Sequence, residues 1–153
     1  MITKKTPIIK AGIVIDIPKS RIRVHKRTIH SMGDPGFVQL LMYEKRAWGE
    51  YMVLDYRIQS DGRNSLTKHL VIQQGKHISY QRHSHRSEIW IVLDGNGKLI
   101  IDGITRSIKR GDTAYITPGM KHAVEAETEL HIIEVQIGDE LTEDDIERLE
   151  WNW

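Results

Sequence analysis

Metal-binding side chains cluster in one short stretch of this 153-residue chain, Gly75 to Glu88 (GKHISYQRHSHRSE). Alternate residues of an extended strand share a face, so Gln81 and His83 are predicted to project from the same side of one strand. A polar break then precedes the apolar run IWIVL, which places Glu88 at the start of a returning strand. Much later, His122 follows a Pro-Gly turn signal and offers a ligand from a distant strand.

Two imidazoles, an amide oxygen and a carboxylate form a ligand set that suits a divalent ion. Zinc is favoured, but manganese, cobalt, iron and nickel are alternatives, because ligand type alone does not choose among these metals. A single His or Gln on a strand is more often a surface or core residue than a ligand. The prediction therefore depends on the combination of Q-x-H, a Glu at hairpin distance and P-G-x-x-H. The predicted ligands are Gln81, His83, Glu88 and His122.

The elements that must position these ligands are predicted to be strands. Short apolar runs, separated by turn signals such as DGNG and RGD, recur as FVQLLMY, YMVLDY, HLVIQ, IWIVL, KLIID, TAYIT and LHIIEVQI. This spacing is typical of an all-β barrel or sandwich. One short helix is predicted near the C-terminus, where Thr142 is a candidate N-cap and Asp144 and Asp145 favour the positive end of the helix dipole. Ile146 and Leu149 would form its apolar stripe.

Composition narrows the classes of function. The 22 basic and 21 acidic residues leave a net charge of +1, which gives no reason to expect binding to nucleic acid. The absence of cysteine excludes disulfides and thiolate metal sites. No apolar run approaches the ~20 residues of a membrane-spanning helix, and the start of the chain lacks the apolar segment of a signal peptide. We therefore expect a single-domain cytoplasmic protein without membrane partners.

Two stretches resemble the two motifs of the cupin superfamily: GKHISYQRHSHRSEIWIVLDG resembles the first motif and GDTAYITPGMKH resembles the second. Within the superfamily, the chain resembles type II mannose-6-phosphate isomerases, often the C-terminal half of a bifunctional mannose-1-phosphate guanylyltransferase. The segment RAWGEY resembles that family's R-P-W-G-x-Y motif. The central motif of the family resembles KHLVIQQGKHISYQRHSHRSEIW, and the C-terminal part of its pattern resembles IIEVQIGDELTEDDIERLE. The likeness covers about Arg46 to Glu150.

The resemblance implies a double-stranded β-helix, the jelly-roll barrel of cupins, over residues 46–153. Residues 1–45 would form an N-terminal arm of extra strands, with candidates at GIVIDI and RIRVH. Because such arms commonly exchange between cupin subunits, a homodimer is expected. The absence of a G-G-x-G-T-R-like phosphate loop indicates a stand-alone cupin without a nucleotidyltransferase half.

The resemblance also implies a function. It places the family's metal ligands on Gln81, His83, Glu88 and His122, the same residues that the spacing selects. Gln81 stands where most cupins have His, which is the isomerase pattern. The implied reaction converts mannose 6-phosphate to fructose 6-phosphate through an enediol, with a cation stabilising the developing oxyanion.

Roles follow for residues beside the ligands. His85 is predicted to be the base that moves the proton, because imidazole titrates near neutral pH. Lys68 is predicted to polarise a substrate oxygen or to bind phosphate. Arg86 and Lys121 are predicted to bind the phosphate of a sugar phosphate. The structural alternatives are a turn residue or fifth ligand for His85 and solvent-exposed cations for the others.

Departures from the family pattern leave alternatives open. Ala47 and Gln74 replace prolines of the pattern, and Ser84 replaces the middle residue of its His triplet. The family's D-x-Y-G-R element, with an Arg near the substrate, does not follow DDIER, where the chain reads LEWNW. A non-catalytic metal- and sugar-binding cupin is therefore a second hypothesis. A metal-dependent dioxygenase is a third, although iron dioxygenases normally have more imidazole ligands.

Overall fold

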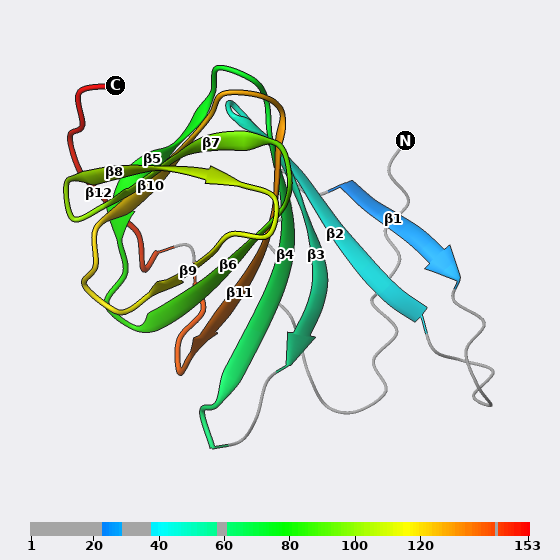
Figure 1. Ribbon diagram of the computed structural model, residues 1–153. Helices are drawn as coiled ribbons and strands as arrows, with labels where there is room; N and C mark the ends of the chain where they lie inside the picture. The colour runs from blue at the N-terminus through cyan, green and yellow to red at the C-terminus, as the bar shows by residue number, and fades with distance from the viewer. Residues whose placement is uncertain (1–22, 29–37, 58–60, 143) are drawn as a thin grey trace.

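Two antiparallel β-sheets face each other across one apolar core in the computed structural model of the chain (Figure 1). The structure describes residues 23–28, 38–57, 61–142 and 144–153. In spatial order, the larger sheet contains β1 (Arg23–Thr28), β2 (Val38–Arg46), β3 (Gly49–Arg57), β4 (Asn64–Ile72), β11 (Leu130–Gly138), β6 (Arg86–Asp94) and β9 (Thr113–Ile116). The smaller sheet contains β12 (Glu147–Arg148), β5 (His77–Arg82), β10 (His122–Ala126), β7 (Asn96–Ile101) and β8 (Ile104–Lys109).

The core is built by alternation along the strands. In β4 and β11 every second residue is buried, as expected for strands with one face on a core and one face turned away from it. Ile72, Leu130 and Ile132 of the larger sheet meet Leu99 and Val124 of the smaller sheet, and each is at most 1% exposed. Burial of each such side chain contributes roughly 1.5–3 kcal/mol. This shared core holds the two sheets together.

The predicted all-β architecture is confirmed, but the predicted C-terminal helix is wrong. Among the described residues the C-terminal segment is extended: β12 pairs with β5, and the Leu149 amide donates to the Tyr80 carbonyl over 2.8 Å. Leu149 and Trp151 pack on Tyr80, Ile100 and Ala123. Their spacing of two suits a strand that pairs with β5, so tertiary contacts override the local helix signals. No described helix is long and apolar enough to cross a bilayer.

The structure describes only part of the predicted N-terminal arm, residues 1–45. The predicted strand GIVIDI, at residues 12–17, lies outside the described residues, whereas β1 overlaps the predicted strand RIRVH. β1 pairs with β2, and β2 with β3, at one edge of the larger sheet. In Figure 1 this pair projects away from the barrel as an extension of the same layer.

Candidate metal centre

Three of the four predicted ligands, His83, Glu88 and His122, meet in the protein interior. Their possible ligand atoms all lie within 4.8 Å of one another, and each residue is at most 2% exposed. His83 Nε2 is 3.1 Å from Glu88 Oε1, and His122 Nε2 is 3.5 Å from Glu88 Oε2. Two imidazole nitrogens therefore face the two oxygens of one buried carboxylate.

The two sheets supply these ligands together. Glu88 projects inward from β6 of the larger sheet, while His122 opens β10 of the smaller sheet. His83 follows β5, and Gln81 of β5 is the register partner of His122. A register shift next to this pair lets both Ile78 and Gln81 be buried. The structure thus places Gln81 on the strand beside His122.

Backbone carbonyls orient both imidazoles. His83 Nδ1 is 2.7 Å from the Asp145 oxygen, and His122 Nδ1 is 3.0 Å from the Met120 oxygen. A carbonyl only accepts, so each Nδ1 carries the hydrogen in a neutral ring and each Nε2 presents a lone pair toward Glu88. His122 Nε2 is buried and has no hydrogen-bond partner. A lone pair of His122 Nε2 that faces a buried carboxylate with no donor between them is stabilised by a cation, so the donor set fits a divalent metal ion.

Arg86 contacts the same ligands instead of facing solvent. Its Nε donates to Glu88 Oε1 over 2.9 Å, its Nη1 donates to the Thr142 carbonyl over 2.9 Å, and its Nη2 is 3.3 Å from His83 Nε2. Trp90 Nε1 donates to the other oxygen of Glu88 over 3.1 Å. Arg86 and Trp90 therefore fix the orientation of the Glu88 carboxylate, which is the usual task of groups surrounding a metal ligand.

A cavity of about 500 Å³ opens beside these ligands, a volume that suits a small molecule. Gln81, Arg86 and Glu88 form part of its wall. The other lining residues combine aromatic, cationic and acidic side chains: Lys45, Arg46, Ala47, Trp48, Tyr51, Lys68, Leu70, His77, Ile78, Ser79, Glu134, Gln136, Ile146 and Arg148.

Glu134 is a second buried carboxyl group in this cavity, 7% exposed. It lies on β11, beside Lys68 of β4, and accepts a hydrogen bond of 2.7 Å from Gln136 Nε2. Burial and the nearby charge of Glu88 raise the pKa of Glu134, while Lys68 and Gln136 partly offset that rise. Lys68 is also buried, with its Nζ 4.5 Å from the centre of the Tyr51 ring. The structure thus places Lys68 in the wall of the cavity.

The sequence contained a signal for Glu134 and Gln136 that was missed. In LHIIEVQI they share the inward face of β11 with Leu130 and Ile132, where a core strand would carry apolar side chains. Polar residues at buried strand positions need partners, and functional sites are a common reason for them. The inward polar pair therefore marks the cavity wall.

His85 and Lys121 are not brought into the site. Both side chains are exposed, and neither lines the cavity. Their backbone amides donate to Asp145 Oδ2 and Asp102 Oδ1, over 3.0 and 2.9 Å respectively. Both are close to ligands in sequence, but each lies in a turn segment that directs its side chain outward. Proximity in sequence to a ligand was thus a poor guide to position.

Asp145 ties the C-terminal segment to the ligand turn, which gives a stability prediction. Its side chain accepts hydrogen bonds from the Ser84 and His85 amides, over 2.8 and 3.0 Å. Asp145→Ala is expected to lower the free energy of unfolding by about 2 kcal/mol, because hydrogen bonds to a charged acceptor are lost. Urea denaturation measures this change. Asp144→Ala, at an exposed neighbouring position, is the control; equal losses in the two variants would contradict the assignment.

Glu88 provides a pH prediction for the metal-free protein. Burial acts to raise its pKa, but contacts with His122 and His83 outweigh burial and hold the pKa well below the ordinary value of 4.5. A carboxyl group with a depressed folded-state pKa contributes stability above its ordinary value, and this stability is lost as the pH falls through the folded-state pKa. Melting temperatures of wild type should therefore fall more steeply than those of Glu88→Gln below about pH 4.5. Parallel curves would refute this, and exposed Glu127→Gln should follow wild type.

Comparison with known proteins identifies relatives of most of the chain. Residues 37–151 match the family described as "Mannose-6-phosphate isomerase C-terminal". Mannose-1-phosphate guanylyltransferase of Salmonella montevideo is 36% identical over 105 residues, and alginate biosynthesis protein AlgA of Pseudomonas aeruginosa is 38% identical over 107. These alignments cover 67% and 69% of this chain but 21% of each relative. The chain thus spans about a fifth of the length of these proteins.

Solved structures confirm the cupin fold. An RmlC-like cupin from Shewanella frigidimarina superposes with a TM-score of 0.58 at 17% identity, covering 78% of this chain and 96% of that one. Capsular polysaccharide assembling protein CapF of Staphylococcus aureus gives a TM-score of 0.59 at 15% identity, covering 72% and 34%. Identities this low establish the fold alone.

Proposed function

The chain belongs to the mannose-6-phosphate isomerase C-terminal family, and we propose that it is a metal-dependent aldose-ketose isomerase that interconverts mannose 6-phosphate and fructose 6-phosphate. One observation carries the proposal. The buried His83, Glu88 and His122 cluster lies beside a cavity that holds a further carboxyl group, Glu134, not required as a ligand. A cation site next to a second acid-base group is what proton transfer between adjacent carbons requires.

His83, Glu88 and His122, with Gln81 beside them, would hold the divalent ion. When bound, the ion supplies positive charge that stabilises an oxyanion on the substrate. Zinc is favoured, with manganese, cobalt, iron and nickel as alternatives for this ligand set. Arg86 and Trp90 keep the Glu88 carboxylate in place through their hydrogen bonds.

Glu134 takes the role first predicted for His85. A base for carbon-bound protons must reach the substrate, and Glu134 lines the cavity whereas His85 does not. The hydrogen bond from Gln136 fixes the carboxyl group, and the raised pKa suits a group that takes up a proton and returns it. Lys68, the neighbour of Glu134 on β4, would donate a hydrogen bond to a substrate oxygen.

The phosphate would bind to Lys45 and Arg148, exposed cations at the cavity, instead of Arg86 and Lys121. Arg148 comes from β12 and is the register partner of Gln81, so the C-terminal segment brings a guanidinium next to a predicted metal ligand. A guanidinium offers the planar donor pair that phosphate oxygens accept. Arg148 could thus serve in place of the arginine that the family pattern supplies further along.

The test is turnover of the purified chain loaded separately with zinc, manganese and cobalt. Metal-dependent conversion of mannose 6-phosphate to fructose 6-phosphate, lost on chelation, is the expected result. An absence of turnover at stoichiometric metal would overturn the proposal for this substrate. If mannose 6-phosphate then still bound in a calorimetric titration, the non-catalytic metal- and sugar-binding cupin would replace it.

A further inference from the structure

Two histidines outside the interior cluster meet on the outer face of the larger sheet. His69 of β4 and His131 of β11 project away from the core, because the residues on either side of each are buried. The register pairs His69 with Ile133 and Val71 with His131, so the two rings are diagonal neighbours on adjacent strands. His69 Nε2 lies 3.2 Å from His131 Nδ1, and the ring centroids are 5.3 Å apart.

These two separations are close to those of two imidazoles that share one metal ion. Nitrogens about 2.0–2.1 Å from a tetrahedral zinc ion lie about 3.3 Å from each other, and the centroids of their rings lie about 5.2 Å apart. On adjacent corners of a square-planar ion the nitrogens lie about 2.9 Å apart. His69 and His131 therefore need little movement to chelate an ion.

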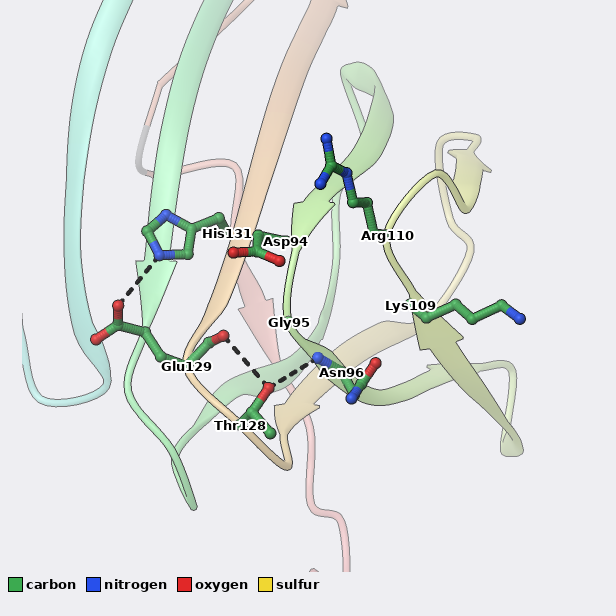
Figure 2. Close-up of a pocket in the computed structure, with 8 residues that line it drawn as sticks. All are labelled: Asp94, Gly95, Asn96, Lys109, Arg110, Thr128, Glu129 and His131. Atoms are coloured by element: carbon green, nitrogen blue, oxygen red, sulfur yellow. Dashed lines mark hydrogen bonds and ion pairs between the residues drawn. The ribbon is translucent and has the colours of Figure 1, made fainter.

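Glu129 orients one of the two rings for this role. Its Oε1 is 3.1 Å from His131 Nε2, and Figure 2 marks this contact beside the start of β11. A carboxylate only accepts, so in a neutral ring His131 Nε2 carries the hydrogen and His131 Nδ1 presents a lone pair toward His69. A carboxylate that holds the far nitrogen of a ligand histidine is a common arrangement around metal ions.

The turn that carries Glu129 is fixed by close backbone contacts. Gly95 has a φ of 85°, and a Cβ at this position would lie 2.1 Å from the Glu129 carbonyl oxygen, so the approach of the two segments requires glycine. Thr128 Oγ1 accepts a hydrogen bond of 2.9 Å from the Asn96 amide, which Figure 2 also shows. The Glu129 carboxylate thus extends from a well-defined turn.

In the metal-free protein a single hydrogen joins the two rings. Because His131 Nδ1 accepts, His69 Nε2 donates. Burial and the neighbouring charge of His131 lower the pKa of His69 below its ordinary value of 6.5, so this ring is neutral at pH 7, as a metal ligand must be. An incoming ion displaces the hydrogen from His69 Nε2, and the neutral ring then carries its hydrogen on Nδ1.

Solvent and ions can reach this pair. The His131 side chain is 29% exposed, and it borders a hollow of about 550 Å³ (Figure 2). The other residues that line this hollow are Asp94, Gly95, Asn96, Lys109, Arg110, Thr128 and Glu129. In the described part of the chain only the interior cluster brings three His, Asp or Glu side chains together, so at the outer pair water would fill the remaining coordination positions.

We propose that His69 and His131 form a second metal site, separate from the interior centre, that binds one divalent transition-metal ion such as zinc or copper. Both ions bind imidazole nitrogen well, and copper leads the Irving–Williams order. The ion would join β4 to β11 on the outer face, while the inner face of the same strand pair carries Lys68 and Glu134. It would therefore stabilise the strand pairing that positions two residues of the cavity.

The test is a zinc titration of the purified full chain, followed by calorimetry and by competition with a chromogenic chelator. Wild type should bind two equivalents, a tight one at the interior centre and a weaker one that is filled only by added zinc. His69→Asn and His131→Asn should each weaken the second equivalent at least ~100-fold and keep the first, since even a group that supports a ligand is typically worth 10–100-fold. His85→Asn, which replaces an exposed histidine outside the pair, should keep both.

Two further measurements distinguish a built site from zinc bound adventitiously by a surface histidine. Glu129→Ala should lower the affinity for the second equivalent by about 10–100-fold, whereas Glu127→Ala, at an exposed position two residues earlier, should not. Nitrogen NMR of the histidine rings should show that the second equivalent moves the hydrogen of His69 from Nε2 to Nδ1 and leaves His131 Nε2 protonated.

A wild type that binds one equivalent only, or a second equivalent that survives in both His69→Asn and His131→Asn, would overturn the proposal. So would ring spectra of His69 and His131 that do not respond to the second equivalent. The first equivalent reports that each variant is folded. The two sites are separated by the residue that removes each ion, and turnover is not measured, so the outcome is independent of the proposed reaction.

Discussion

His122→Ala is expected to strip the metal from the purified protein and to abolish isomerase turnover with it. The substitution removes a buried Nε2 that faces Glu88 and has no hydrogen-bond partner. Replacing even a group that only supports a metal ligand typically costs 10–100-fold in affinity, so loss of a ligand should cost at least ~100-fold. Competition with a chromogenic chelator measures the affinity, and elemental analysis gives the stoichiometry.

His85→Ala is the matched control for that experiment. His85 belongs to the same motif as the ligands, but its side chain is exposed and does not line the cavity. It should retain stoichiometric metal and near wild-type turnover. If His85→Ala lost metal as completely as His122→Ala, His85 would be a ligand and the arrangement of three side chains around one ion would need revision. If His122→Ala kept the wild-type metal affinity, the assignment of a metal site to these residues would be wrong.

Glu134→Gln is expected to lower kcat by ~10²–10⁴ while leaving metal content unchanged. The amide keeps the shape of the side chain and an oxygen that can accept from Gln136 Nε2, but it cannot take up the carbon-bound proton. Single-turnover kinetics of mannose 6-phosphate conversion at saturating substrate measure the step. Glu125→Gln on β10, whose carboxylate lies 3.5 Å from Lys98 and does not line the cavity, should behave as wild type.

The pattern of kinetic constants separates catalysis by Glu134 from a structural role. Loss of an acid-base group lowers kcat with little change in KM, and it should remove the corresponding limb of the pH-rate profile. A rise in KM with kcat unchanged would instead assign Glu134 to substrate binding. Unchanged kcat and KM would exclude it from the reaction and return the question of the base to Lys68 and the other cavity residues.

Part of the candidate metal centre could be predicted from the sequence because the spacing of its ligands depends on residues close together in the chain. The Q-x-H spacing puts Gln81 and His83 on one strand face, and the turn before Glu88 starts the next strand with a ligand facing the same interior. His122 was predictable because a Pro-Gly turn ends one strand just before it. The structure brings His83, Glu88 and His122 together, with Gln81 on the strand beside His122.

Other predictions failed where local signals compete with distant contacts. Thr142, Asp144 and Asp145 favour a helix, yet Asp145 binds the Ser84 and His85 amides and β12 pairs with β5. A hydrogen-bonded edge and an apolar surface on the smaller sheet, neither visible in the local sequence, stabilise the extended form. Helix propensity is a property of the isolated segment, whereas in the folded protein the segment gains hydrogen bonds and packing contacts with the smaller sheet.

The sequence by itself determined the strands, the all-β class and the four candidate ligands, because period-two alternation and turn residues act over a few neighbours. Only the tertiary structure decided that Glu134 lies beside Lys68 in the cavity, that His85 and Lys121 face outward, and that Arg148 reaches the site. These facts depend on the pairing of strands that are far apart in the chain. Strand register across such distances is set by the packing of the whole barrel, and no short window of sequence contains it.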